Sequence, residues 1–140
     1  MNNAKYKITS IVPLGYEAYA ELYDPEDKEI NVGAGTSFSY DSSLSTMSAT
    51  VNCIVLQAGK TLERAALKCE FLFSPESIRE LTVENKIILS QSLLAELASV
   101  TYNTLRGIVF AVSQGTRLNK IILPIFDFTP FVGDDFVIEI

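Results

Sequence analysis

Apolar and polar residues alternate along several stretches in the first half of the chain. Alternation with a period of two is typical of β-strands, because successive side chains point to opposite faces of a sheet. The pattern predicts a strand at 5–12 that ends at Pro13, since proline cannot donate to a strand ladder. A long crossing segment with an exposed acidic turn follows up to Glu29. Three further strands are then expected at 30–40, 46–57 and 62–73.

The last of these strands indicates that one face of the sheet is packed and the other is wet. Apolar side chains alternate there with charged ones, Leu67, Cys69, Phe71 and Phe73 against Arg64, Lys68 and Glu70. Antiparallel sheets commonly divide their faces in this way. A tight hairpin at 58–61 is expected to join this strand to the preceding one. Ser74, Pro75 and Glu76 open a short helical turn or a loop after it.

A longer period begins at residue 91, where a helix is expected to run to about residue 113. Ser90 is placed to cap its first turn, and Gly115 supplies a left-handed stop after its last. Its apolar residues fall within an arc of roughly 180°, wider than a helix lying on one sheet needs. They are Leu93, Leu94, Leu97, Ala98, Val100, Leu105, Ile108, Val109 and Val112. We expect a helix buried on both sides, by its own sheet and by another subunit; the alternative is a merely apolar helix with one exposed Phe.

The polar side of this helix holds the candidates for an oligomer interface, Tyr102, Arg106, Gly107 and Phe110. Phe110 projects among polar residues, and Tyr102 lies at the margin. Gly107 costs about 1 kcal/mol relative to alanine unless a neighbour packs closely there. Two extended pieces are expected beyond the helix, at 118–126 and 135–140. The predicted fold class is therefore α+β, in a single domain spanning 1–140.

Composition narrows the chemistry that this domain can perform. The chain has 140 residues and a net charge of −6, and it contains no histidine. An acidic chain without a basic stripe is not expected to bind nucleic acid. The missing imidazole excludes a Ser-His-Asp or Cys-His pair and any histidine metal ligand. Cys53 and Cys69 are expected to be buried free thiols, and two thiols alone cannot form a zinc site.

Nothing else in the sequence indicates an enzyme, a metal or a cofactor. The carboxylates at 24–29 lack the spacing of a calcium loop, and the glycines at 33 and 35 do not lead into a phosphate-binding helix. A carboxylate pair that meets only in the fold stays open, but none stands out. The first residues lack a signal-peptide core, and no apolar run approaches the roughly 18 residues of a membrane span. We expect a cytoplasmic binding protein without cofactor, metal or membrane insertion.

Three stretches in the second half resemble the SecB-like export chaperone family. Residues 69–78 (CEFLFSPESI) resemble that family's fourth strand and its exit. Residues 102–108 (YNTLRGI) resemble a stretch of its core helix, and the Gly-Thr at 115–116 with the Leu-Pro-Ile at 123–125 is similar to its helix stop and the segment beyond. The order and spacing of the three pieces also fit. The resemblance runs from residue 46 onward and covers about two-thirds of the chain.

The resemblance implies a four-stranded antiparallel sheet with one long helix packed on it, assembled as a dimer of dimers. It implies an ATP-independent chaperone that holds unfolded polypeptide or preprotein in apolar grooves and, in the export branch, delivers it to SecA. The strand stretch at 30–35 lacks the acidic residues that contact SecA in the family. The C-terminal amphipathic helix is replaced by short extended segments at 126–140. Service to a dedicated partner, such as a toxin–antitoxin module, is therefore the alternative to bulk export.

The candidates for polypeptide binding are aromatic residues outside the sheet core, Tyr16, Tyr19, Tyr23, Phe128 and Phe131. Aromatic rings offer a large contact area with few rotors to freeze. The ordinary interpretation of the three tyrosines is loop aromatics pinned onto the sheet. Two other functions stay open, a structural or interaction domain without chaperone activity and a hotdog-type thioesterase. The thioesterase fold places its long helix after the early strands, whereas here the helix follows all four.

Overall fold

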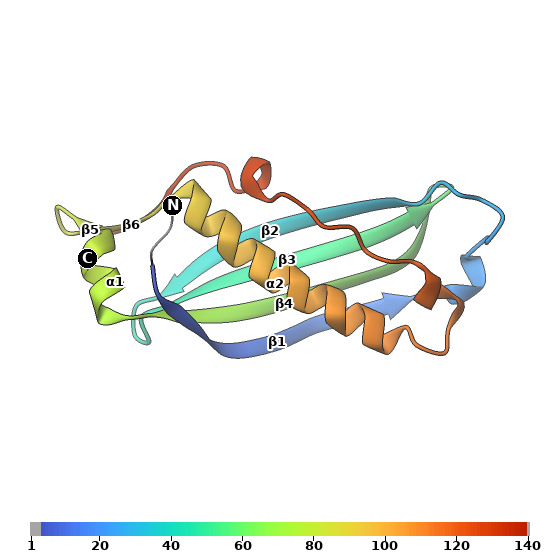
Figure 1. The fold of residues 1–140 in the computed structure, drawn as a ribbon, viewed down its shortest axis with the longest axis horizontal. Helices are drawn as coiled ribbons and strands as arrows, with labels where there is room; N and C mark the ends of the chain where they lie inside the picture. The colour runs from blue at the N-terminus through green and yellow to red at the C-terminus, as the bar shows by residue number, and fades with distance from the viewer. Residues whose placement is uncertain (1–3, 140) are drawn as a thin grey trace.

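The computed structural model describes residues 4–139 and shows an α+β fold (Figure 1). Four strands form one antiparallel sheet in the order β1-β4-β3-β2. They are β1 (Tyr6–Ala18), β2 (Asn31–Asp41), β3 (Thr46–Gln57) and β4 (Lys60–Phe73). Helix α2 (Gln91–Val112) lies diagonally across one face of the sheet (Figure 1). The predicted sheet and long helix are confirmed.

Strand β1 is longer than the sequence pattern predicts. We expected it to end at Pro13, but it continues to Ala18 along β4, with register shifts before Ser10 and between Pro13 and Gly15. The prediction was wrong because β1 is an edge strand. A proline is tolerated there, since its missing N–H deprives no neighbouring strand of a hydrogen bond. The crossing segment is correspondingly shorter and contains only the 3₁₀ turn η1 (Ala20–Leu22).

The turns and caps follow the local sequence signals. Ala58 and Gly59 both have positive φ in the hairpin between β3 and β4, as a two-residue turn of primed type requires. Ser90 accepts a hydrogen bond from the Leu93 N–H at the start of α2, and Gly115 has φ of +82° beyond its end. Ser74 likewise caps α1 (Pro75–Leu81). The predicted hairpin, the Ser90 cap and the Gly115 stop are confirmed.

A second, smaller sheet lies at one end of the molecule (Figure 1). It contains β5 (Thr82–Val83), β6 (Lys86–Leu89) and β7 (Phe136–Glu139), all antiparallel. The extended piece expected at 135–140 therefore forms a strand against β6 of the same chain, with residue 140 outside the described part.

The core lies between the large sheet and α2. Every second residue of β3 and β4 faces the helix and is buried, while the alternate residues face away. The principal contributors are Met47, Val51, Leu67, Phe71, Leu93, Leu97 and Leu105. Cys53 and Cys69 are buried free thiols, as expected.

The chain between α2 and β7 is less regular than predicted. We expected a strand-like piece at 118–126, but the 3₁₀ turn η2 (Arg117–Lys120) begins it and no strand partner follows. A further 3₁₀ turn, η3 (Thr129–Phe131), lies near its end. We call residues 121–131 the strap. It runs back over the helix-facing side of the molecule, from the C-terminal end of α2 toward β7 (Figure 1).

Candidate polypeptide-binding groove

An apolar groove separates the strap from the start of β2. It has a volume of about 410 Å³. Its lining residues come from the crossing segment, β2, the end of η2 and the strap: Tyr23, Ile30, Val32, Lys120, Ile121, Ile122, Pro124 and Phe126. Three segments that are distant in sequence thus meet at one open apolar surface.

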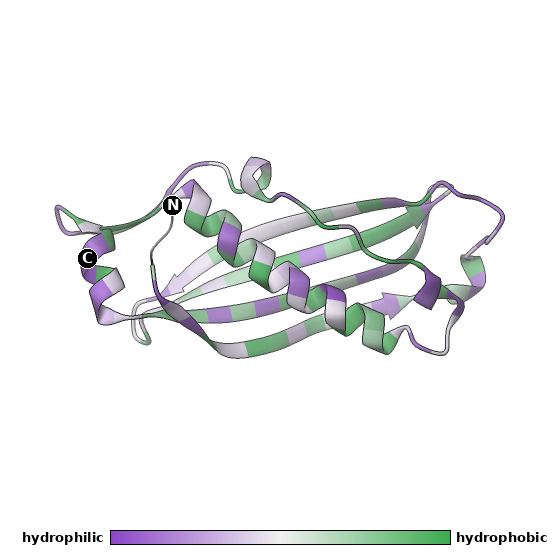
Figure 2. Cartoon of the chain, viewed as in Figure 1, coloured by the Kyte–Doolittle hydropathy of each residue, from purple (hydrophilic) through white to green (hydrophobic). Residues whose placement is uncertain are grey.

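The strap exposes large aliphatic side chains beside this groove. Ile122 is 74% exposed and Ile125 is 79% exposed, while Leu123 between them is buried in the core. Figure 2 shows the hydrophobic residues along this part of the strap. Exposed aliphatic residues next to an apolar groove are typical of a surface that binds another chain.

Two side chains of α2 hold the strap in place. The Tyr102 hydroxyl donates to the carbonyl oxygen of Pro124 at 2.7 Å, and Arg106 Nε donates to the carbonyl oxygen of Leu123 at 3.0 Å. Residues four apart on a helix lie on the same face, so both donors reach neighbouring strap residues. Burial raises the pKa of Tyr102 to about 12, so its hydroxyl remains a donor at neutral pH.

An aromatic cluster completes the attachment of the strap. Phe126 and Phe128 pack against Tyr102 with ring centroids 5.2 and 5.4 Å away, and Phe131 lies 5.8 Å from Phe128. Tyr102 and Phe128 are almost fully buried, whereas Phe131 is about half exposed. Phe128 therefore anchors the strap inside this protomer, and Phe131 remains accessible.

The crossing segment contributes Tyr23 to the groove, carries the acidic turn next to it, and is fixed to the sheet. The Gln57 side chain accepts from the Asp24 N–H and donates to the carbonyl oxygens of Asp24 and Asp27, at 2.8 to 3.0 Å. The Arg117 guanidinium lies over the Tyr23 ring, 5.8 Å from its centroid. The expected acidic turn is thus present and is held in a defined position.

The three candidate tyrosines occupy different places. Tyr23 lines the groove, while the Tyr19 hydroxyl bonds to Glu17 at 3.1 Å near the sheet edge. Tyr16 lies in β1 and donates to Glu63 at 2.8 Å, away from the groove. Sequence reasoning missed Ile122 and Ile125. Their signal was the short apolar run at 121–126, which predicts a buried extended piece and not exposed side chains.

Three of the four helix candidates gather at another depression, of about 320 Å³. Arg106, Gly107 and Phe110 form one wall of it and the strap forms the other. Phe110 is 56% exposed, and apart from the adjoining backbone of α2 nothing in the described chain lies within 4 Å of the place where a Cβ on Gly107 would stand. Tyr102, the fourth candidate, is 1% exposed and lies under the strap.

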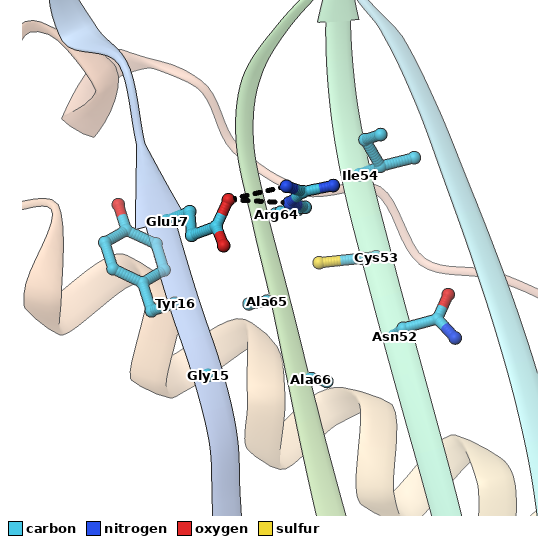
Figure 3. A pocket seen from close by; sticks show the side chains of 9 residues that line it. All are labelled: Gly15, Tyr16, Glu17, Asn52, Cys53, Ile54, Arg64, Ala65 and Ala66. Atoms are coloured by element: carbon cyan, nitrogen blue, oxygen red, sulfur yellow. Dashed lines mark hydrogen bonds and ion pairs between the residues drawn. The ribbon is translucent and has the colours of Figure 1, made fainter.

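The face of the sheet away from α2 carries a shallow depression of about 340 Å³ (Figure 3). Gly15 and Ala66 are part of its lining, and Asn52 lies along it. Glu17 and Arg64 form an ion pair across it, with a 2.7 Å separation between Arg64 Nη2 and Glu17 Oε2 (Figure 3). Small side chains therefore form part of its lining, and the charges of Glu17 and Arg64 neutralise each other.

Strand β4 carries a buried carboxyl group next to β1. Glu63 is 2% exposed; one oxygen accepts from Tyr16, and the other has no hydrogen-bond partner in the described chain. Burial raises the pKa of Glu63, and the Tyr16 hydrogen bond opposes this in part. Burial, followed by the charge of Glu63, raises the pKa of the Cys53 thiol to about 11, so this cysteine is an unreactive thiol.

Two kinds of site are absent from residues 4–139. No three side chains among Cys, Asp and Glu gather as a potential metal site there. Within the same residues, no helix has the length and apolar character needed to cross a membrane.

A four-stranded antiparallel sheet with one long helix packed on it is the SecB-like fold. Among solved structures the chain is similar to the Mycobacterium tuberculosis Rv1957 SecB-like chaperone in complex with a ChAD peptide from the Rv1956 HigA1 antitoxin. That similarity has a TM-score of 0.60 at 15% identity and covers 86% of this chain and 89% of the other. No protein-family model matches the chain, and no curated protein matches it in sequence.

Proposed function

We propose that this protein is an ATP-independent holding chaperone, which binds extended, apolar polypeptide in the groove between the crossing segment and the strap. The observation that carries the proposal is the groove itself, with Ile122 and Ile125 exposed beside it. A folded chain normally hides such side chains unless a partner covers them. The SecB-like fold, and a neighbour of that fold holding an antitoxin peptide, support this function.

The groove suits many sequences rather than one. Apart from Lys120, its lining side chains are aliphatic, aromatic or proline, so they bind apolar side chains of a client without requiring one particular sequence. The adjoining turn carries Asp24, Glu26, Asp27 and Glu29 against one lysine. Clients with Lys or Arg near their apolar residues are therefore favoured, and their binding weakens as salt rises.

A dedicated polypeptide partner fits this chain better than SecA. On the face of the sheet away from α2, Glu17 pairs with Arg64 and Glu70 pairs with Lys68, at 2.7 and 3.5 Å. An acidic docking surface needs unpaired carboxylates, and these two are neutralised by their neighbours. An antitoxin-like segment is the kind of partner that we propose.

We further propose a cytoplasmic homo-oligomer, a dimer of dimers, that performs no catalysis. Arg106, Gly107 and Phe110 offer a depression and an exposed ring to a second subunit. A second apolar groove, of about 390 Å³, lies between β1 and α2, with Leu14 and Ile108 among its lining residues. A structural domain without chaperone activity is the competing function. A thioesterase is disfavoured by the position of the helix after all four strands.

The test is suppression of aggregation of a chemically unfolded client, measured by light scattering. Ile122→Ser and Tyr23→Ser are expected to weaken suppression, because each removes apolar area from the groove. Leu44→Ser and Val83→Ser are matched controls, since both side chains are exposed and lie outside the groove. Equal suppression of aggregation by the groove and control variants would show that the groove does not bind the client. Inactivity of the wild type would favour the structural domain.

Tyr16 is not a suitable position for testing client binding. Removing its hydroxyl leaves the Glu63 carboxylate without its hydrogen bond, and the loss of a partner of a buried charge destabilises the fold. A triple replacement of Tyr16, Tyr19 and Tyr23 would therefore mix unfolding with lost binding.

A further inference from the structure

The two edges of the large sheet differ in how they are protected. Strand β1 has two register shifts and a proline, which twist and interrupt its edge. Strand β2 pairs with β3 over all 11 of its residues without a shift, and it contains no Pro, Lys or Arg. Natural sheets usually protect a long edge with such residues or bulges. The edge of β2 carries neither.

This edge is open in the protomer. β2 is the outermost strand of its sheet, and no backbone hydrogen bond joins it to the strap or to the crossing segment within residues 4–139. The groove lies at the start of this strand, where Ile30, just before β2, and Val32 within it are lining residues. A polypeptide in the groove therefore lies beside a row of unpaired backbone donors and acceptors.

We propose that the free edge of β2 receives the bound polypeptide as a fifth, extended strand. This inference rests on the proposed function and specifies how the client is held. Main-chain hydrogen bonds supply affinity in strand addition, and alternate side chains supply specificity. Because main-chain groups are common to all sequences, this mode is compatible with a client set of varied sequence.

The side chains of β2 specify what the added strand carries. Val32, Ala34, Phe38 and Tyr40 face the helix side and are partly buried, so the added strand presents apolar residues at alternate positions there. On the opposite face β2 has only small side chains near its middle, at Gly33, Gly35 and Ser37. An aromatic or β-branched residue of the added strand packs favourably when it lies opposite a glycine of the edge strand.

The charges near β2 distinguish two possible occupants of its edge, a foreign polypeptide and a second copy of this chain. Between residues 24 and 41 there are five carboxylates and one cation, Lys28. In an antiparallel pair of β2 edges, the acidic turn of one copy lies toward Asp41 of the other, and like charges repel. A client with Lys or Arg at both ends of its apolar segment meets attraction at both ends instead. The structure thus favours a cationic client strand.

The experiment uses an 11-residue fluorescent peptide, the length of β2, with alternating apolar residues and a Lys at each end. Two further versions carry backbone N-methyl groups, one on odd and one on even positions. In an added strand, N–H groups of one parity bond to β2 and those of the other point away. We expect methylation of one parity to weaken binding about 100-fold or more, and methylation of the other by only a few-fold.

A protein variant tests the same edge from the other side. Ser37→Lys places a charge on the β2 edge and is expected to lower the affinity of the cationic peptide about tenfold or more. Thr9→Lys, at an exposed position of β1, is the matched control and is expected to have little effect. Ser37→Lys reduces self-association instead if a second copy occupies the edge, and that result would overturn the proposal.

The remaining outcomes separate this inference from the proposed function. If both methylated peptides bind as the parent does, the client is held by side chains and strand addition is wrong, while the chaperone function stands. If the parent peptide does not bind but unfolded clients are still held, strand addition by a cationic segment is likewise overturned. Loss of both peptide binding and client holding would overturn the proposed function as well.

Discussion

The Tyr102 hydroxyl donates to the Pro124 carbonyl oxygen at 2.7 Å and thereby ties the strap to the polar side of α2. This side is the one for which the sequence predicts a second subunit. Over the region around Tyr102, the chain supplies the cover itself, through Phe126 and Phe128. A tyrosine buried within an aromatic cluster needs a partner for its hydroxyl, and the proline carbonyl is that partner.

Tyr102→Phe tests the attachment of the strap. The variant keeps the ring and its packing but loses the hydrogen bond, which is expected to cost about 1 kcal/mol of unfolding free energy. Hydrogen exchange of the strap amides is expected to accelerate more than that of the sheet amides. Equal acceleration throughout the chain, or no change in the strap, would show that this bond does not hold it.

Glu63 gives the protein a specific pH dependence. Because burial raises the pKa of Glu63, its ionised form destabilises the folded state relative to the unfolded chain. The destabilisation is fully present above the folded-state pKa and is lost as pH falls toward the ordinary value of 4.5. Glu63→Gln lacks this titration. We expect wild type to gain stability relative to Glu63→Gln as pH is lowered from 8 to 5, in urea unfolding at each pH.

The control for the pH series is Glu26→Gln, in the exposed acidic turn. It removes a carboxylate without changing the environment of Glu63. A difference between wild type and Glu63→Gln that does not change with pH would show that the carboxyl is not titrating in the folded state.

Local sequence signals predicted most of the elements, while their partners were harder to predict. The Ser90 cap and the left-handed Gly115 depend on neighbouring residues alone, and both predictions hold. The end of β1 was missed at Pro13, because tolerance of a proline depends on whether a strand lies at an edge. That is a property of the whole sheet.

The groove was only partly predictable for the same reason. Tyr23 was recognisable as an aromatic residue in a polar segment, and the structure places it in the groove. Ile122 comes to line one groove with Val32 of β2 only because the strap runs back alongside α2. That path depends on the contacts of Tyr102 and Arg106, which lack a periodic pattern.

Phe110→Ser tests whether the polar side of α2 joins subunits. Burial of a phenylalanine contributes about 1.5–3 kcal/mol, so its loss is expected to raise the dissociation constant of the assembly about tenfold or more. Light scattering after size-exclusion chromatography measures the molar mass over a dilution series. Leu44→Ser is the matched control, because Leu44 is similarly exposed in the turn between β2 and β3. Unchanged dissociation of Phe110→Ser would place the interface elsewhere.

Gly107→Ala separates a helix that faces solvent from one that faces a second subunit. Within the described protomer the added methyl meets nothing within 4 Å, so helix propensity alone predicts a gain of about 1 kcal/mol in protomer stability. If another subunit packs closely on Gly107, the same methyl group separates the two surfaces and weakens assembly. We therefore expect a more stable protomer and a less stable oligomer, measured by urea unfolding below and above the dissociation concentration. A gain of equal size at both concentrations would show that Gly107 faces solvent in the assembly.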